Sequence, residues 1–168
     1  MSEAVFEGKH VLLMERDGWE FVERKRGKSA VAIIARTDEG SLVLTEQYRR
    51  AVDARVIDLP AGLVGDENPD EDPGETARRE LHEETGFACE DIELVMGGPS
   101  SPGITSEIVE LYRATGLTRR GHGGGVDGED ITVHEVPLNG IEQWLRRKQE
   151  DGVLIDLKVW SGLYFVSR

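Results

Sequence analysis

The sequence predicts an α/β fold in which a mixed β-sheet carries helices on its faces. Strand-like runs follow one another along most of the chain, one helical pattern interrupts them, and two more helical patterns close it. No internal repeat and no linker long enough to divide domains is present. Because 168 residues suffice for one domain with a substantial core, we expect residues 1–168 to form a single domain, with 1–28 as an N-terminal extension of strands.

Eight runs predict strands, because each is rich in aliphatic or β-branched residues and most end in turn residues. In chain order they are 9–16, 18–25, 29–36, 41–49, 54–65, 91–97, 106–115 and 131–136. Asp17 and Gly18 predict a tight turn between the first two runs. The third run is apolar almost throughout and indicates a strand buried on both faces. Pro60 breaks the fifth run into two pieces.

Three segments predict helices, and the first, 73–86, has readable ends. Pro73 suits the first turn, where its missing N–H costs nothing, and Glu75 suits the positive end of the helix dipole. Gly86 suits a C-terminal stop, and the residues between are mostly good helix formers. Apolar residues at helical spacing predict two more helices, which are 138–150 and 154–165.

Charge and cysteine content limit the classes of partner. A net charge of −13 argues against nucleic acid and against an anionic membrane surface. Cys89 is the only cysteine, so no intramolecular disulfide forms and a reducing compartment is favoured; we expect it to be a buried, small apolar residue. No signal peptide and no apolar run of about 18 residues is present, so we expect a cytoplasmic protein.

The first predicted helix carries a cluster of carboxylates. Residues three or four apart on a helix share a face, so Glu80, Glu83 and Glu84 converge on one side while Ala77 and Leu81 form an apolar stripe on another. Carboxylates this close repel one another unless a cation lies among them. A ligand set of oxygens, with no Cys and few His, favours Mg²⁺, or Mn²⁺, over zinc. Taken as helix surface alone, the same charges would be a solvated face.

The carboxylates belong to a longer pattern over 65–87, G-x5-E-x7-R-E-U-x-E-E-x-G-U, where U is a bulky apolar residue. Its defined positions are Gly65, Glu71, Arg79, Glu80, Leu81, Glu83, Glu84, Gly86 and Phe87. This stretch resembles the signature box of the Nudix hydrolases, with every defined position filled. The resemblance implies a Nudix-type α/β/α sandwich and a Mg²⁺-dependent enzyme that cleaves a diphosphate linked to another group.

Segments outside the box resemble the ADP-ribose pyrophosphatase group of that family. In chain order they are 46–50, 59–65, 101–107 and 128–133. By this resemblance Ala61 offers its carbonyl to a metal ion, Arg49 or Arg50 contacts phosphate, and Pro102 with Gly103 belongs to the substrate site. Read as residues alone, the proline and glycine are turn chemistry, and the arginines can close an exposed strand end.

The resemblance also implies roles for the acidic residues. Glu80 and Glu84 would hold the metal ions together with the Ala61 carbonyl, and Glu83 would assist as a ligand, directly or through water.

Arg79 would orient the carboxylates, with Glu71 as its partner. In the ADP-ribose group the general base comes from a mobile loop, here the glycine-rich segment 120–130. Glu129 is the candidate for the base or a further metal ligand, and Asp127 competes with it.

The N-terminal extension fits the same group, whose members often exchange N-terminal strands between the subunits of a homodimer. Trp19, Glu20 and Phe21 would then lie near the partner's site, where an aromatic side chain can stack on a nucleobase. The alternative is that Trp19 and Phe21 fill one face of a strand, since residues i and i+2 point to the same side.

We therefore expect hydrolysis of a nucleotide sugar, with ADP-ribose giving AMP and ribose 5-phosphate. Two alternatives stay open. The same chemistry could act on GDP-mannose or another nucleotide sugar, or the chain could be a regulatory module that binds ADP-ribose without cleaving it. The complete set of box carboxylates argues against the regulatory module.

Overall fold

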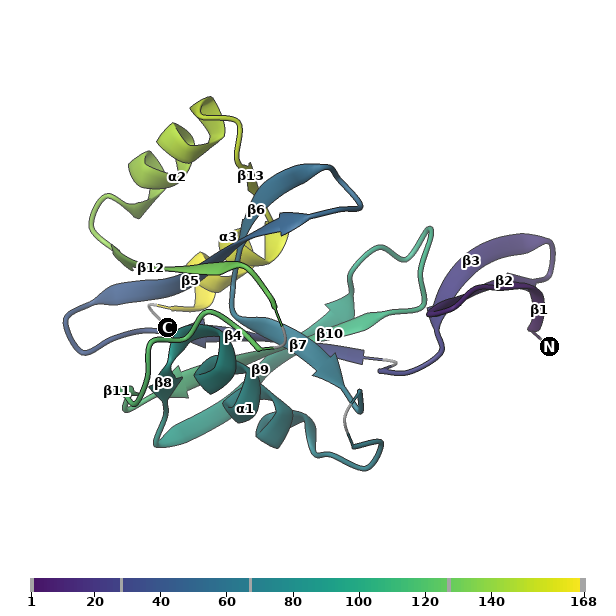
Figure 1. Ribbon diagram of the computed structural model, residues 1–168, viewed down its shortest axis with the longest axis horizontal. Helices are drawn as coiled ribbons and strands as arrows, with labels where there is room; N and C mark the ends of the chain where they lie inside the picture. The colour runs from purple at the N-terminus through teal and green to yellow at the C-terminus, as the bar shows by residue number, and fades with distance from the viewer. Residues whose placement is uncertain (1, 28, 67, 127, 167–168) are drawn as a thin grey trace.

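The computed structural model describes residues 2–27, 29–66, 68–126 and 128–166. They form two four-stranded sheets with three helices packed on them, and a smaller N-terminal sheet that projects to one side (Figure 1). The predicted α/β class with mixed strand directions is confirmed. The strands divide between two large sheets, where the sequence alone indicated one.

The N-terminal sheet contains β1 (Glu3–Glu7), β2 (Val11–Arg16) and β3 (Trp19–Arg24), all antiparallel. The turn predicted between β2 and β3 is present: Asp17 has φ 54° and Gly18 has φ 80°, the two positive values that a type I′ turn requires. Strand β1 was not predicted, because a run of three apolar residues between two glutamates is too short to carry a clear strand signal.

The N-terminal sheet is attached to the segment before β10. The N–H of Val22 donates to the carbonyl of Ile104 at 2.8 Å, and the N–H of Ser106 donates to the carbonyl of Val22 at 3.2 Å. Arg24 adds an ion pair to Glu107 at 2.8 Å. The extension is therefore connected to the 101–107 loop of the same chain.

The first large sheet has the order β7-β4-β10-β9 and carries the first helix. Its strands are β4 (Ser29–Ala35), β7 (Ala61–Val64), β9 (Asp91–Pro99) and β10 (Ile108–Thr115). Strands β4 and β10 are parallel, and the other pairs are antiparallel. Helix α1 (Pro73–Thr85) packs against β7, β4 and β9. A short pair, β8 (Phe87–Ala88) with β11 (Thr118–Arg119), follows the C-terminal end of α1.

The second large sheet has the order β12-β5-β6-β13. Its strands are β5 (Ser41–Arg49), β6 (Ala54–Asp58), β12 (Ile131–Pro137) and β13 (Leu154–Ile155). Helix α2 (Ile141–Glu150) packs against β12 and β13, and α3 (Leu157–Phe165) packs against β4 and β6. Among the described residues, no helix is long and apolar enough to cross a membrane.

Strand β4 is buried on both faces, as its unbroken apolar run predicted. Val31 and Ile33 belong to the core cluster on the α1 side, whereas Ala32 and Ile34 belong to the cluster that includes Val159 of α3. The alternation has the period of two expected of a strand. A helix thus covers each face of this sheet, which agrees with the layering that the resemblance implied.

The C-terminal helices begin later than predicted. Leu154 and Ile155 pair in parallel with β6, so α3 starts only at Leu157. Helix α2 starts at Ile141 because Gly140, with φ 93°, cannot continue the helix toward its N-terminus. The start of α3 is therefore decided by the pairing of Leu154 and Ile155 with β6, which the spacing of apolar residues in the sequence could not predict.

Candidate active site

Helix α1, which carries the box carboxylates, begins and ends as predicted. Asp72 is its N-cap and accepts two backbone N–H groups of the first turn at 2.9 and 3.4 Å, with Pro73 at the first position. Gly86 ends the helix with φ 75°. The apolar stripe of Ala77 and Leu81 is fully buried. Glu84, three residues after Leu81, is buried on the same side, so the predicted separation of the stripe from the carboxylates does not hold for Glu84.

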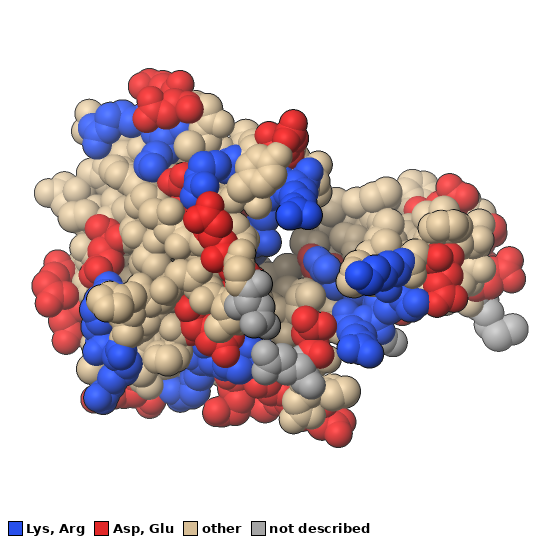
Figure 2. Space-filling model, in the orientation of Figure 1, with Lys and Arg blue, Asp and Glu red and all other residues tan. Residues whose placement is uncertain are grey.

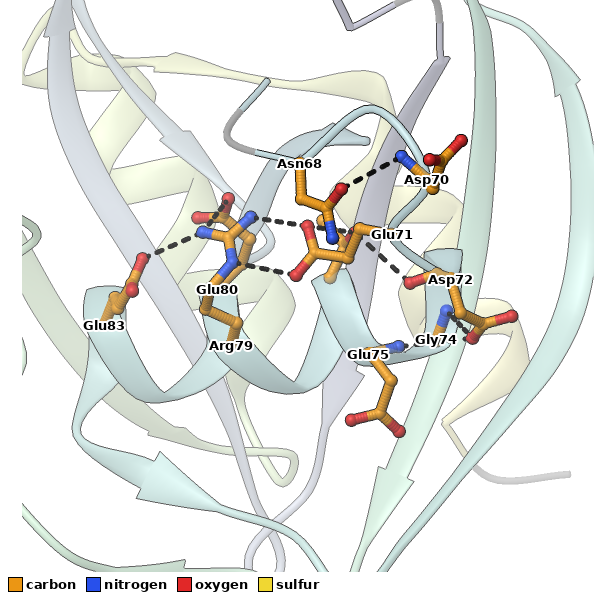
Figure 3. Close-up of polar contacts among 10 residues, drawn as sticks. Asn68, Asp70, Glu71, Asp72, Gly74, Glu75, Arg79, Glu80 and Glu83 are labelled. Atoms are coloured by element: carbon orange, nitrogen blue, oxygen red, sulfur yellow. Dashed lines mark hydrogen bonds and ion pairs between the residues drawn. The ribbon is translucent and has the colours of Figure 1, made fainter. Parts of the chain in front are cut away.

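The guanidinium group of Arg79 lies among three carboxylates (Figure 3). Its Nε and Nη2 donate to the two oxygens of Glu71 at 3.2 and 3.3 Å, which confirms the predicted pairing. Its Nη1 donates to Glu80 at 3.0 Å and to Glu83 at 3.1 Å. The hydrogen bonds with Arg79 hold the pKa of Glu71 below its usual range. One side chain thus sets the relative positions of three box carboxylates.

Glu84 is held against the start of β7. Its Oε2 accepts the N–H of Ala61 at 2.9 Å, and only 6% of the residue is exposed. Burial raises the pKa of Glu84 to about 8; the Ala61 N–H opposes this rise, and the charges of Glu80 and Glu129 add to it. The structure therefore brings together Ala61 and a box carboxylate that lie far apart in the chain.

Like Glu84, Glu80 is a largely buried carboxylate with other acidic residues around it. Burial raises its pKa to about 7, Arg79 opposes the rise, and the charges of Glu83 and Glu129 add to it. Buried carboxylates that repel one another are stabilised by a divalent cation, and their oxygens suit Mg²⁺ or Mn²⁺. Within the part of the chain that the structure describes, no three Asp, Glu, His or Cys side chains stand in an arrangement that could hold a metal ion; Glu80 and Glu83 instead bind Arg79.

The glycine-rich loop is attached to the C-terminal end of α1. The N–H of Gly124 donates to the carbonyl of Glu84 at 2.8 Å, and the N–H of Gly125 donates to the carbonyl of Glu83 at 3.1 Å. A Cβ on Gly123 would lie 2.4 Å from the α1 backbone, so only glycine allows this approach. Sequence reasoning anticipated a mobile loop, but these bonds connect part of it directly to the box helix.

Beyond the attached glycines, the negative charge of Glu129 acts on two box carboxylates. Its charge contributes to the raised pKa of both Glu80 and Glu84. Its Oε2 accepts the N–H of Val126 at 3.2 Å, which holds the side chain back toward its own loop. Asp127 lies outside the described residues, so the ranking of Glu129 over Asp127 stays a prediction.

The two arginines at the end of β5 act on different groups. The charge of Arg49 lowers the pKa of Glu84, whereas that of Arg50 acts on Tyr48. The charge of Arg49 therefore reaches the box. Figure 2 shows a hollow between the N-terminal sheet and the rest of the chain, with Lys and Arg side chains on both sides of it.

The remaining predicted residues lie on the N-terminal sheet and in the loop to which this sheet is attached. Phe21 is buried at the base of the N-terminal sheet with 8% exposed, whereas Trp19 is 62% exposed and Glu20 is also exposed. The alternative in which both aromatic residues fill one strand face therefore holds only for Phe21. Pro102 and Gly103 are exposed in the loop to which the N-terminal sheet is attached.

Comparison with known proteins agrees with this geometry. A family model described as NUDIX domain matches residues 25–153, which include the whole box, β7 and the glycine-rich loop. The chain belongs to the NUDIX domain family.

Relatives of this Nudix chain differ in name. A "Methanol dehydrogenase activator" from Bacillus methanolicus is 35% identical over 88% of this chain and 82% of its own length. An "ADP-ribose pyrophosphatase" from Bacillus subtilis is 33% identical, and a "GDP-mannose pyrophosphatase" from an Enterobacter species is 32% identical, each over 82% of this chain and 76% of the relative. A solved "ADP compounds hydrolase" has the same fold, with a TM-score of 0.68 and 22% identity over 87% of this chain and 80% of that one.

One residue near the Nudix box escaped sequence reasoning. Arg119 lies over the ring of Phe87 at 4.2 Å from its centroid, donates to the carbonyl of Thr85 at 3.4 Å, and binds Glu135. It connects the C-terminal end of the box to β12. No motif in the sequence joins these distant positions. The three glycines at 123–125 were interpreted as a sign of mobility, whereas the structure shows that Gly123 allows a close approach to α1.

Proposed function

We propose that this Nudix chain hydrolyses the diphosphate of a nucleotide sugar, with ADP-ribose as substrate and AMP and ribose 5-phosphate as products. The observation that carries the proposal is the complete set of box carboxylates, ordered by Arg79 and placed against Ala61. The substrate rests on the relatives named ADP-ribose pyrophosphatase, one of which, from Mycobacterium tuberculosis, is 39% identical over 65% of this chain.

The metal belongs to the proposal, as Mg²⁺ with Mn²⁺ as an alternative. Glu80 and Glu84 would hold it with the Ala61 carbonyl, and Glu83 would assist. Each glutamate would use the carboxylate oxygen that is not bonded to Arg79 or to the N–H of Ala61. A divalent ion at this place would lower the pKa of the attacking water and offset charge on the diphosphate. Arg79 fixes the carboxylates relative to one another and does not contact substrate, because its donors are already engaged with glutamates.

Glu129 is our candidate for the general base, with Asp127 as its competitor. The proximity of Glu129 to Glu80 and Glu84 supports this role, since its charge acts on both. It would take the proton from a water molecule that attacks one phosphorus atom. The attachment of the glycine-rich loop to α1 would keep this base in a fixed relation to the box.

Arg49 is our candidate for the substrate phosphates, because a guanidinium group offers bidentate contacts and its charge already reaches Glu84. Arg50, Pro102 and Gly103 are kept as candidates at the edge of the substrate site. The Lys and Arg side chains around the hollow in Figure 2 suit an anionic ligand despite the acidic chain.

We further propose that the chain acts as one Nudix hydrolase domain in a cytoplasmic homodimer. The exposed Trp19 and Glu20 on the projecting sheet would contribute to the base pocket of the partner subunit, and the buried Phe21 would support the strand that carries them. Light scattering of the whole chain tests the dimer, and removal of residues 1–24 should yield a monomer. A dimer that persists after this removal would refute a role for the N-terminal sheet in assembly.

The test of the proposed function is turnover of ADP-ribose, GDP-mannose, ADP-glucose, NADH and 8-oxo-dGTP at fixed Mg²⁺, with chromatography of the products and Glu84→Gln as the inactive control. Selective release of AMP from ADP-ribose is the expected result. Preference for GDP-mannose would retain the mechanism and overturn the substrate, an alternative favoured by the relatives that carry that name. Binding of ADP-ribose without cleavage of any compound would make the chain a regulatory module.

A further inference from the structure

Gly62, in strand β7, lies directly beneath the carboxylate of Glu80. A Cβ built on Gly62 would stand 2.0 Å from Cδ, 2.1 Å from Oε1 and 2.4 Å from Cγ of Glu80. Real Cβ atoms do not approach other atoms this closely. The side chain of Glu80 therefore occupies the space that any residue other than glycine would fill at position 62.

The backbone gives no other reason for glycine at this position. Gly62 is not among the residues with positive φ, and it pairs in ordinary antiparallel register with Val31 of β4. Glycine in a strand interior weakens the strand, since it has no side chain to pack and loses the most entropy on folding. The three atoms nearest to the missing Cβ all belong to the side chain of Glu80 and none to the helix backbone.

Glu80 cannot yield easily to a new side chain. Its Oε1 accepts from Nη1 of Arg79 at 3.0 Å, and only 16% of its side chain is exposed. Arg79 in turn is bound to Glu71 and Glu83, so its guanidinium group is fixed from two further sides. A methyl group at position 62 would therefore displace the carboxylate and break its bond with Arg79.

We propose that Gly62 is a positioning residue of the active site. Because it has no side chain, it leaves the space that the Glu80 carboxylate occupies, and we call this space the steric seat of Glu80. In this role it fixes where one oxygen ligand of the divalent cation stands. The inference rests on the proposed function only in taking Glu80 as a cation ligand. The steric seat itself follows from the positions of Gly62 and Glu80.

The experiment is Mn²⁺ binding by the whole chain, followed by calorimetry and by electron paramagnetic resonance, in Gly62→Ala, Glu80→Gln and the double variant. Mutation of a residue that orients a metal ligand typically weakens metal affinity by about 10- to 100-fold. We expect Gly62→Ala to weaken binding in that range, and the double variant to bind no more weakly than Glu80→Gln alone, because the two changes act on one carboxylate. Gly97→Ala is the matched control, since a Cβ there makes only ordinary contacts at 3.7 and 3.8 Å in strand β9.

Wild-type affinity in Gly62→Ala, together with weakened binding in Glu80→Gln, would overturn the inference and leave the proposed function intact. Wild-type affinity in Glu80→Gln would overturn the ligand assignment of the proposed function, and with it the metal role of Gly62. If Gly62→Ala folds poorly, thermal unfolding in the presence of a chelator provides a second test. Glu80→Ala removes the side chain that clashes with the new methyl group, so the double variant Gly62→Ala/Glu80→Ala should have the same Tm as Glu80→Ala alone. Failure of that rescue would refute the steric seat.

Discussion

Replacement of Arg79 by methionine tests whether this side chain holds the box together. The guanidinium group makes hydrogen bonds of 3.0 to 3.3 Å with Glu71, Glu80 and Glu83. The exposed fraction of its side chain is 21%, and those of its partners lie between 16% and 24%. Removing one partner of a largely buried charge pair costs about 3–5 kcal/mol, and the remaining exposure places the cost at the lower end, about 3 kcal/mol.

For a chain of this size, a loss of about 3 kcal/mol lowers Tm by about 6–12 °C. Thermal unfolding followed by circular dichroism in a chelator measures this, and millimolar Mg²⁺ should restore part of the loss because it returns positive charge to the carboxylates. Arg79→Lys should also be impaired, since a single ammonium group cannot reproduce the fork that binds three carboxylates.

The control is Arg113→Met, which breaks one ion pair to the exposed Glu93 and should cost less than about 1 kcal/mol. A loss in Arg79→Met no larger than this control would refute the reasoning. So would a rise in KM at unchanged kcat, because that pattern belongs to a residue that binds substrate.

Three further changes test other parts of the structure. Glu84→Gln should reduce kcat by at least about 100-fold with unchanged Tm, because a neutral amide suits the buried site but loses the metal ligand; near-normal turnover would contradict the assignment. Burial disfavours the charged form of Glu46, yet hydrogen bonds from Lys148 and Arg55 outweigh it and lower its pKa from 4.5 to about 2. This contribution to stability is present above pH 4.5 and is lost as pH falls toward 2. Urea unfolding at neutral pH and at about pH 3 should therefore show that acid lowers the free energy of unfolding less in Glu46→Gln than in the wild type. Equal decreases in the two proteins would refute this reasoning. Gly123→Ala should detach the glycine-rich loop from α1, seen as faster hydrogen exchange of the following amides, and unchanged protection would show that the close approach does not require glycine.

The N-terminal sheet was predicted only in part. Its turn could be read from Asp17 and Gly18, because two positive φ values favour such residues whatever surrounds them. Its contact with the 101–107 loop could not be predicted, since the bonds of Val22 with Ile104 and Ser106 use backbone groups, which every residue type except proline carries. The same limit applies to β13, which exists because Leu154 and Ile155 pair with a strand far away in the chain.

The sequence by itself determined the box helix, its ends and its carboxylates. Asp72, Pro73 and Gly86 act through neighbours within one turn, and helical spacing alone places Arg79 beside Glu83, so local chemistry suffices. Only the tertiary structure decided which residues from other segments of the chain contact the box helix.

The contact of Glu84 with Ala61, the approach of Glu129 to the box and the seat of Glu80 on Gly62 each join segments that are distant in the chain. Such contacts depend on how sheets and loops pack against one another. The sequence shows a glycine in a strand at position 62 but not the reason for it, because the Glu80 side chain that fills the space of its Cβ belongs to helix α1.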